Sequence, residues 1–399
     1  MNQGKSIAIA ICAVVVVAAL STWQLLTGLG TRDDAKADLS HATAAEVAYP
    51  PPLPYWPPVA IRTPGKNEVE LCGYGSVDPE RVPGIFEAEA NAAILRVATE
   101  FEHRADERRR ALGLVTRALI DAEAADRGVM AEDPQKCREA AGLCDERAAE
   151  AFARAATPAI EALTRLAVTT RDPETYVVAL RACRSIIPNS PPTSCNALTL
   201  DQWAQLDQDN AFAWLLTARA AQIRKDPIGF QDALRRASHA KSFERRPTPY
   251  GEILAGLDVR AEPVRTLIVG KLAAAEARED PADYFSNFTM FTIYCTNQSE
   301  PGRRELCNDL AHVMTELSTD PLAAQVGDQI AAKAGWPVER RTAARTKHAA
   351  LDAERPVRSP GSARLTCDGA AQTEEWLVGV AKHGEETYLR ALIAKHNAR

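Results

Sequence analysis

Apolar residues recur with a helical period through most of the chain. Tyr176 is followed one turn later by Ala179 and Leu180, and the same spacing follows Phe230. Residues three and four positions apart share one face of an α-helix, so each series forms a stripe that a neighbouring helix can bury. Much of the apolar content is alanine, which combines a small side chain with the highest helix propensity. The pattern predicts an all-α fold built from about a dozen closely packed helices.

Two short stretches depart from this helical period. Apolar and polar residues alternate between Glu68 and Val77, and again between Arg364 and Cys367. Alternation with a period of two is typical of extended chain. We therefore expect a short extended piece at each end of a helical domain that spans residues 68–399.

Asp-Pro pairs mark the expected helix starts. An aspartate accepts hydrogen bonds from the free amides of the first turn, and a proline at the first helical position has no amide to leave unpaired. Proline also keeps the preceding residue out of the α region, which suits an N-cap residue. The pairs are Asp78-Pro79, Asp133-Pro134, Asp172-Pro173, Asp226-Pro227, Asp280-Pro281 and Asp320-Pro321. Weaker signals of the same kind are Thr157-Pro158, Thr248-Pro249 and Trp336-Pro337.

Three of these starts share a longer pattern, Asp-Pro-x-x-aromatic. The aspartates stand at positions 172, 226 and 280, so successive copies are 54 positions apart. The aromatic residues are Tyr176, Phe230 and Tyr284. A fixed period of this length is typical of structural repeats of paired helices. The pattern predicts that the three aromatic residues are buried at equivalent places, although so short a match also arises by chance.

In the middle of the chain, the sequence predicts a pair of helices with the residue pattern of a known repeat family. Trp214 is followed four positions later by Ala218, and a second helix carries small residues from Ala233 onward. The pair resembles a tetratricopeptide repeat over about 35 residues, although Thr217 and Ala221 stand where that motif prefers leucine and tyrosine. The resemblance implies a helical-repeat solenoid or an array of helix hairpins that binds a protein or peptide on a concave surface. The whole chain resembles uncharacterised helical-repeat envelope proteins of Gram-negative bacteria.

An apolar segment occupies residues 6–29, after a short N-terminus of residues 1–5. A helix of about 24 residues is roughly 36 Å long, which is enough to cross a bilayer core of roughly 30 Å. We expect an uncleaved transmembrane anchor in the inner membrane, with the following domain in the periplasm. A cleaved signal peptide with an apolar core from Ile7 to Leu20 is the alternative, and it yields a secreted chain. Residues 30–67 are polar and then proline-rich, which predicts a semi-rigid linker.

Eight cysteines follow the apolar segment, and six of them pair by proximity along the chain. An even set of paired cysteines is typical of an exported chain in an oxidising compartment. Zinc or redox chemistry is the alternative, but the chain has no Cys-x-x-Cys sequence and no histidine at ligand spacing from a cysteine. The expected disulfides are Cys137–Cys144, Cys183–Cys195 and Cys295–Cys307, with Cys72–Cys367 by elimination.

The pair Cys137 and Cys144 imposes a geometric condition. Seven residues of unbroken helix would separate the two Cα atoms by about 10 Å, which is beyond the reach of a disulfide. A bond therefore requires a break in the helix, and Gly142 offers a place for it.

The remaining chemistry of the sequence is sparse. The net charge of −6 argues against a general nucleic-acid-binding protein. No nucleophile elbow, zinc-protease helix, phosphate loop or dinucleotide fingerprint occurs. We therefore identify no catalytic residue, no cofactor site and no metal site from the sequence, and we expect each histidine to be exposed or to cap a helix.

The densest group of aromatic residues lies near the third Asp-Pro-x-x-aromatic copy. Tyr284, Phe288 and Phe291 share one helical face, which predicts core packing. Phe285 and Tyr294 lie off that face, so they are the candidate partner-binding residues.

The sequence is compatible with three functions. The first is a scaffold that binds a protein or peptide of the cell envelope. The second is an envelope hydrolase that acts on a cell-wall or peptide substrate through an unrecognised site. The third is a structural domain that associates with itself. A deep pocket lined by two carboxylates favours the hydrolase, whereas an open groove with exposed aromatic residues favours the scaffold.

Overall fold

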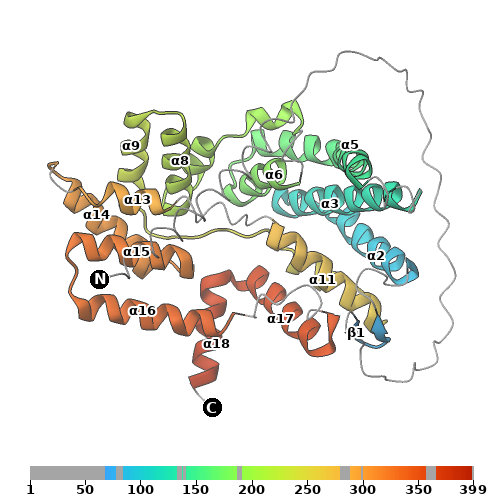
Figure 1. The fold of residues 1–399 in the computed structure, drawn as a ribbon. Helices are drawn as coiled ribbons and strands as arrows, with labels where there is room; N and C mark the ends of the chain where they lie inside the picture. The colour runs from blue at the N-terminus through green and yellow to red at the C-terminus, as the bar shows by residue number, and fades with distance from the viewer. Residues whose placement is uncertain are drawn as a thin grey trace, which may run out of the picture. The chain divides into compact units, whose positions relative to one another are not determined.

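Helices dominate the structure, and a single β-hairpin accompanies them among the described residues. The computed structural model describes residues 68–77, 84–132, 137, 141–186, 191–278, 288–297, 300–355 and 365–397. Helices make up most of these residues, so the predicted all-α class is confirmed (Figure 1). In chain order the elements are β1 (Val69–Leu71), β2 (Gly75–Val77), α2 (Gly84–Glu102), α3 (Glu107–Glu132), α5 (Ala141–Thr169), α6 (Pro173–Ser185), the 3-10 helix η2 (Thr193–Ala197), α7 (Leu200–Leu206), α8 (Ala211–Ile223), α9 (Pro227–Ser238), α10 (Gly251–Ala255), α11 (Glu262–Arg278), α13 (Thr289–Tyr294), α14 (Arg303–His312), the π-helix η3 (Val313–Leu317), α15 (Pro321–Ala334), α16 (Val338–Ala353), α17 (Cys367–His383) and α18 (Glu385–Asn397).

Several predictions concern residues outside the described ranges. These are the anchor at 6–29, the linker at 30–67, three of the Asp-Pro pairs (at 78, 133 and 280), Tyr284 and Phe285. Among the helices that the structure does describe, none has both the length and the apolar character needed to cross a bilayer.

The expected extended piece at Glu68–Val77 is a tight antiparallel hairpin. Val69 pairs with Val77 and Leu71 with Gly75. The second expected piece differs, because α17 already begins at Cys367. The carbonyl of Leu365 nevertheless accepts a hydrogen bond of 2.9 Å from the amide of Cys72, so the two regions lie side by side.

Three of the predicted aspartate caps begin helices as expected. The Asp172 carboxylate accepts from the amides of Glu174 and Thr175 at the start of α6. Asp226 caps α9 through the amide of Gly229. Asp320 caps α15 through the amides of its second and third residues. In each helix the following proline occupies the first position, which leaves no unpaired amide there.

The Thr157-Pro158 prediction is wrong, because Pro158 lies inside α5. The Thr157 hydroxyl donates to the carbonyl of Ala153, one turn earlier, at 2.8 Å. Ile160 and Leu163 on the same helix are completely buried. Packing of this face against α3 outweighs the hydrogen bond that proline removes.

The two other weak signals lie near helix starts without supplying a side-chain cap. Pro337 directly precedes α16, and its own position is the N-cap. After Pro249, α10 begins only at Gly251, with Tyr250 as the N-cap. Neither cap residue makes a side-chain hydrogen bond to the helix.

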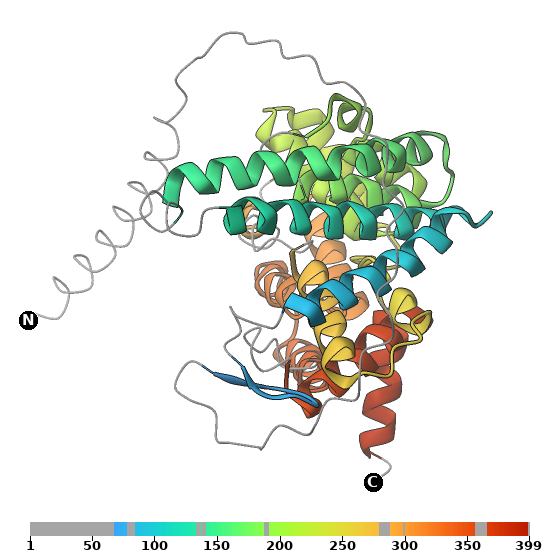
Figure 2. The ribbon, with the colours of Figure 1, turned by 90° about the vertical axis from the view of Figure 1, so that its right-hand side faces the viewer.

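Close helix packing is strongest around α3. This helix packs against α2, α5 and α6, and Figure 2 shows α3 and α5 running side by side. A Cβ atom on Gly113 would lie 2.5 Å from the carbonyl oxygen of Ala98, so glycine permits the close approach of α3 to α2. In this region the small side chains therefore allow the helices to pack closely, in addition to favouring helix formation.

Contacts between helices do not simply follow the chain order. The hairpin of α8 and α9 packs onto α14, which is followed by α15 and α16. α11 returns to α2, and α17 packs against both α10 and α11. A linear solenoid stacks each repeat only on its neighbours. The contacts of α11 with α2, and of α17 with α10 and α11, therefore bring segments from the two halves of the sequence together.

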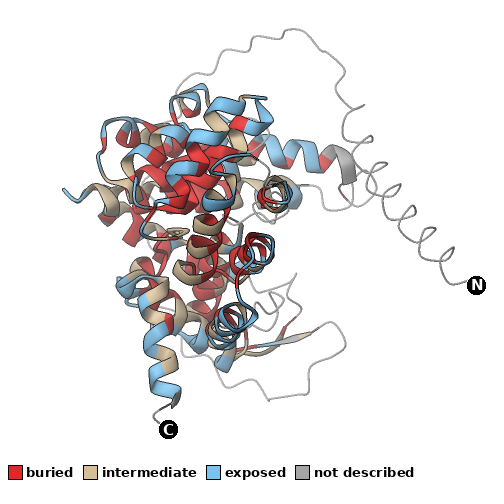
Figure 3. Ribbon diagram, turned by 90° about the vertical axis from the view of Figure 1, so that its left-hand side faces the viewer, coloured by how far each residue is buried: buried red, intermediate tan, exposed pale blue. Residues whose placement is uncertain are grey.

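The helix pair that resembles a tetratricopeptide repeat is present as α8 and α9. Trp214, Ala218 and Ala233 are buried in it. The 54-residue pattern is less regular, since Tyr176 is completely buried whereas Phe230 is half-buried and Tyr284 lies outside the described residues. Burial elsewhere follows the helix faces turned toward other helices (Figure 3), and among residues 385–396 of α18 only Leu389 is buried.

The four cysteine pairs lie at disulfide distance in the predicted combinations. The Cα–Cα distances are 4.6 Å for Cys72–Cys367, 5.3 Å for Cys137–Cys144, 5.8 Å for Cys183–Cys195 and 5.7 Å for Cys295–Cys307. The distance between Cys137 and Cys144 excludes an unbroken helix between them. Gly142, however, lies in the first turn of α5, so the helix does not break at this glycine.

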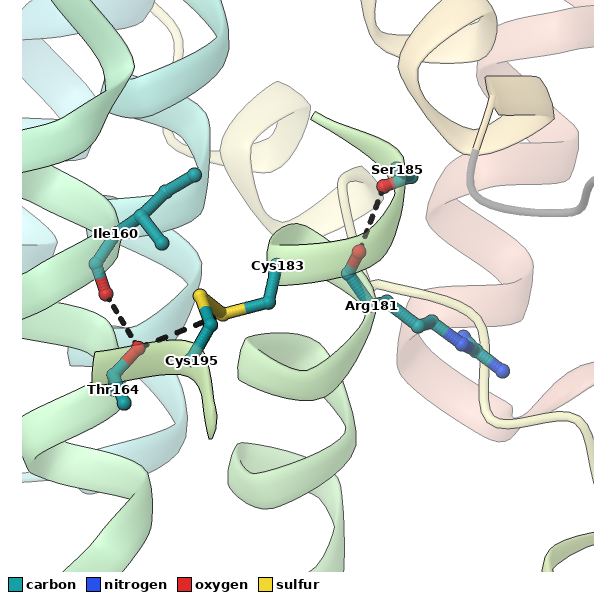
Figure 4. Close-up of a disulfide and its surroundings, with 6 residues drawn as sticks. All are labelled: Ile160, Thr164, Arg181, Cys183, Ser185 and Cys195. Carbon is teal, nitrogen blue, oxygen red and sulfur yellow. Dashed lines mark hydrogen bonds between the residues drawn. A yellow bond between two sulfur atoms is a disulfide. The ribbon is translucent and has the colours of Figure 1, made fainter. Parts of the chain in front are cut away.

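The Cys183–Cys195 pair joins the end of α6 to η2, and Figure 4 shows its surroundings. Thr164 of α5 lies beside it, with its hydroxyl 3.7 Å from the sulfur of Cys183. The same hydroxyl donates to the carbonyl of Ile160 at 2.8 Å. The pair therefore lies inside the packed interface of α5 and α6.

Candidate functional site

An extended segment between α9 and α10 is the centre of the candidate site. It comprises residues 241–249, and we call it the strap. Ser242 forms a parallel bridge with Asn210, and Phe243 forms one with Ser318. The strap thus contacts the α7–α8 turn on one side and the residues before α15 on the other.

The side-chain amide of Asn210 holds the strap in register. Its Nδ2 donates to the carbonyl of Glu244 and to Oδ2 of Asp207, both at 2.8 Å. Its Oδ1 accepts from the amide of Glu244 at 2.9 Å and from that of Phe212 at 3.1 Å. Asn210 is completely buried, and these bonds satisfy its whole hydrogen-bonding capacity. One side chain therefore caps α8 and fixes the strap.

Arg181 of α6 anchors the next two residues of the strap. Its guanidinium donates to the backbone carbonyls of Arg245 and Arg246. Arg181 is buried, so these carbonyls satisfy a charge that is removed from water. Arg246 adopts a backbone φ of +50°, a conformation that costs about 1 kcal/mol for a residue other than glycine. The surrounding hydrogen bonds hold the chain in this turn.

The Arg246 side chain turns toward α6 and α7. Its Nε and Nη2 contact the two carboxylate oxygens of Asp207 at 2.6 and 2.9 Å. Its Nη1 lies 3.2 Å from Glu174 and 3.1 Å from Glu244. One guanidinium thus serves three carboxylates, and Asp207 holds it in the two-pronged geometry that is strongest for such pairs.

The Arg245 side chain turns the other way, toward the C-terminal helices. Its Nε lies 3.4 Å from Asp320, and its Nη2 lies 3.7 Å from Glu385 at the start of α18. Arg355 also pairs with Glu385, at 2.9 Å. Two consecutive arginines therefore connect helices that are far apart in the sequence.

These groups surround an open cavity of about 380 Å³, which we call the charged cleft. Val177, Val178 and Phe243 are among its apolar lining residues. The rim near α17 and α18 carries exposed Lys382 and His383. The charged and titratable lining residues are Arg108, Glu174, Glu244, Arg245, Arg246, Asp320, Lys382, His383, Glu385 and Glu386.

Burial affects the pKa of two carboxyl groups in the cleft. It raises the pKa of Asp320, although the charge of Arg245 opposes this change. It also raises the pKa of Glu244, against the opposing charge of Arg246, and the carboxylate of Asp207 adds to the rise. Both groups are therefore harder to ionise than an exposed carboxyl.

The arrangement suits charge recognition better than proton transfer. The Asp320 carboxylate accepts hydrogen bonds from the amides of Leu322 and Ala323 at 2.9 and 2.8 Å. Glu385 is occupied by Arg355. A general acid or base must exchange a proton with the substrate, whereas these carboxylates hold helices and arginines in place. The cleft contains carboxylates, as the hydrolase reading requires, but most of them are already engaged.

A second, more open hollow of about 320 Å³ contains Tyr294, one of the two candidate partner-binding residues. Tyr294 is half-buried, and its ring meets Phe230 edge to face at a centroid distance of 5.3 Å. The guanidinium of Arg303 lies 4.4 Å from the Tyr294 ring centroid. Phe288 and Phe291 are completely buried, in agreement with their predicted core role. The structure thus separates Tyr294 from the charged cleft.

Sequence reasoning missed the residues that build the cleft. Asn210 lies four positions before Trp214 of the tetratricopeptide-like pair, and its place just before a helix is a signal for an N-cap. Arg245 and Arg246 stand in a proline-flanked loop with no motif around them. Their roles depend on contacts with residues far away in the chain, which no local pattern reveals.

Comparison with known proteins found no match. No protein-family model, no curated protein and no solved structure matches this chain.

Proposed function

We propose that this protein is an exported, membrane-anchored helical scaffold that binds a peptide segment in the charged cleft and does not hydrolyse it. The observation that carries the proposal is the cleft itself, an open cavity with an apolar part and a fixed set of charges. Binding sites typically combine an apolar lining with a few well-placed polar groups. The strap supplies such groups from a backbone that Asn210 and Arg181 hold in place.

The engagement of the carboxylates favours binding over hydrolysis. Glu174 lies 2.5 Å from Arg108, and Glu385 lies 2.9 Å from Arg355. Charges held in advance of binding contribute to affinity because the ligand does not have to order them. The same pairing directs these carboxylates at arginine rather than at a substrate.

Export and anchoring are supported by the sequence pattern. Four cysteine pairs at disulfide distance suit an oxidising compartment. The apolar segment at 6–29 is long enough for a membrane anchor. The hairpin of α8 and α9, with Trp214 and Ala218 buried, is consistent with the tetratricopeptide-like resemblance and with a peptide-binding scaffold.

Selection from a phage library of random twelve-residue peptides tests the proposal. The full chain, with its disulfides formed, is immobilised and used for capture. Two variants serve as comparisons: Thr387→Trp places a large ring at an exposed position that lines the cleft, and Glu339→Trp does so at an exposed position on α16. We expect peptides that bind the wild type and Glu339→Trp but not Thr387→Trp.

Two other results contradict the proposal. Equal capture by Thr387→Trp would place the peptide site outside the cleft. Cleavage of the selected peptides by the wild type, seen by mass spectrometry, would replace binding with the hydrolase function.

A further inference from the structure

We propose that the charged cleft receives a cationic side chain, lysine or arginine, of the bound peptide and that Glu244 pairs with it. This inference rests on the proposed function, because it names the chemistry of the ligand for the same site. It follows from how the carboxylates of the cleft share the arginines.

Three of the lining carboxylates have an arginine that is close and largely their own. Glu174 lies 2.5 Å from Arg108, Glu385 lies 2.9 Å from Arg355, and Glu386 lies 2.5 Å from Arg390. A fourth, Asp320, lies 3.4 Å from Arg245 and also accepts two backbone hydrogen bonds as a helix cap. These four carboxylates have their charge compensated without a ligand.

Glu244 differs from the other four. Its carboxylate lies 3.1 Å from Nη1 of Arg246. The same guanidinium is held by both carboxylate oxygens of Asp207 and also lies 3.2 Å from Glu174. Glu174 also has Arg108, whereas Asp207 takes both close contacts of this guanidinium, so Glu244, the most exposed of the three carboxylates, is left with one shared contact. The Glu244 side chain is 43% exposed, so it remains accessible to a ligand.

The backbone presents Glu244 to the cleft in a fixed position. Both its amide and its carbonyl pair with the side chain of buried Asn210, at 2.9 and 2.8 Å. A carboxylate on such a rigid segment loses little freedom when it binds a cation. A long lysine or arginine side chain can also place its methylene groups along apolar lining residues of the cleft such as Val177, Val178 and Phe243.

The protonation of Glu244 agrees with this geometry. Burial raises its pKa, Arg246 opposes the rise, and the carboxylates of Asp207, Glu386 and Glu174 add to it. A ligand cation would lower this pKa again, because an opposite charge favours the ionised carboxyl. Binding of a cationic peptide therefore strengthens as the pH rises through the titration of Glu244.

Three matched synthetic peptides test the inference. Each has twelve residues with capped ends and the same backbone sequence, taken from the phage selection, and the central residue is lysine, glutamine or glutamate. Affinity is measured by calorimetry on the full chain, its disulfides formed. Glu244→Gln removes the charge while keeping the size of the side chain. Glu305→Gln makes the same charge change in the second hollow, outside the cleft.

We expect the lysine peptide to bind about tenfold more tightly than the glutamine peptide, and the glutamate peptide to bind most weakly. Glu244→Gln removes the preference for lysine, whereas Glu305→Gln retains it. The preference also weakens with added salt, because part of the pairing is exposed to solvent.

The opposite preference overturns the inference and leaves the proposed function intact. Tighter binding of the glutamate peptide that survives Glu244→Gln would place an anion near Lys382 and His383 on the other rim. Equal binding of all three peptides by the wild type would show that the cleft does not read charge. Failure to capture any peptide in the selection would instead remove the proposed function itself.

Discussion

The side-chain amide of Asn210 pairs with both backbone groups of Glu244, as a neighbouring strand would. Oδ1 of Asn210 accepts from the Glu244 amide at 2.9 Å, and Nδ2 donates to the Glu244 carbonyl at 2.8 Å. The two residues are separated by 34 positions and join the α7–α8 turn to the strap. This pairing fixes the backbone on both sides of the candidate ligand-binding carboxylate.

Replacing Asn210 should cost more than the loss of an ordinary helix cap. Asn210→Ala leaves the amide and the carbonyl of Glu244 without these partners and also removes the cap of α8. We expect a loss of about 3 kcal/mol in the free energy of unfolding, because unpaired buried polar groups add to the cost of a lost cap. Chemical denaturation of the full chain measures it.

Asp226→Ala is the matched control for this prediction. Asp226 caps α9 through one amide and is not part of the strap, so its loss should cost about 1 kcal/mol. Equal costs for the two substitutions would show that the pairing with Glu244 contributes nothing to stability.

Local signals predicted three helix starts and the three short-range cysteine pairs that lie at disulfide distance. The caps at Asp172, Asp226 and Asp320 depend on residues within one turn, so a short sequence pattern is sufficient to find them. Pro158 shows the limit of such signals, because packing of α5 against α3 decides its place inside a helix.

The charged cleft could not be predicted in the same way. Arg181 contacts carbonyls that are 64 and 65 positions away, and Arg245 contacts Asp320 and Glu385 from other helices. In the sequence these are ordinary charged residues on helices and in a loop. Their contacts form because helices late in the chain pack against early ones. The spacing of apolar residues does not predict which helices pack together.

The long-range cysteine pair should stabilise the fold more than a local pair. Cys72 and Cys367 are 295 positions apart, whereas Cys183 and Cys195 are 12 apart. Closing a larger loop removes more entropy from the unfolded chain, so we expect losses of about 5 and about 3 kcal/mol when each pair is replaced by alanine. Urea unfolding under oxidising conditions compares the two double variants.

Peptide mapping without reductant supplies the control for the cysteine prediction. It should recover all four pairs and no free thiol among these eight cysteines. In the presence of reductant the two double variants should approach the stability of the reduced wild type. A larger loss from the local pair than from the long-range pair would contradict the entropic explanation.

The compartment of the chain can be tested separately from its stability. If the preceding apolar segment directs export, as the proposed function requires, an alkaline phosphatase fused after Ala48 should be active in bacterial cells. A reporter that works only in the cytosol should be inactive at the same fusion point. The reverse pair of results would contradict export and would leave the cysteine pairs without an oxidising environment.

Tyr294 should behave as a packing residue more than as a free contact. Tyr294→Ala removes the edge-to-face contact with Phe230 and the stacking of Arg303, so we expect destabilisation of about 2 kcal/mol. Tyr294→Phe keeps both ring contacts and should change stability by less than about 0.5 kcal/mol. Unchanged melting of Tyr294→Ala together with weaker peptide capture would instead support the sequence-based assignment of Tyr294 to partner binding.

Buried His348 should make the fold less stable in mild acid. The sequence reading expected exposed or capping histidines, whereas His348 is buried on α16 and its Nε2 donates to the carbonyl of Thr315 at 2.6 Å. Nδ1 is buried with no hydrogen-bond partner among the described residues, so the neutral ring is favoured. Burial lowers the pKa of His348; the carbonyl of Thr315 opposes this, and the charges of Lys347 and Arg355 reinforce it.

The sign of the pH dependence follows from this lowered pKa. An unfolded histidine has a pKa of about 6.5, so the unfolded chain takes up a proton at a higher pH than the folded chain does. The contribution of His348 is therefore fully present above that pH and is lost as the pH falls toward the folded pKa. Asp320 and Glu244, whose carboxyl pKa values are raised, change stability in the opposite direction, so the comparison must isolate the histidine. His348→Gln should flatten the decline in unfolding free energy between about pH 7 and pH 5, while His383→Gln, on the exposed rim of the cleft, should leave it unchanged. A wild-type decline that persists fully in His348→Gln would assign the acid sensitivity to another group.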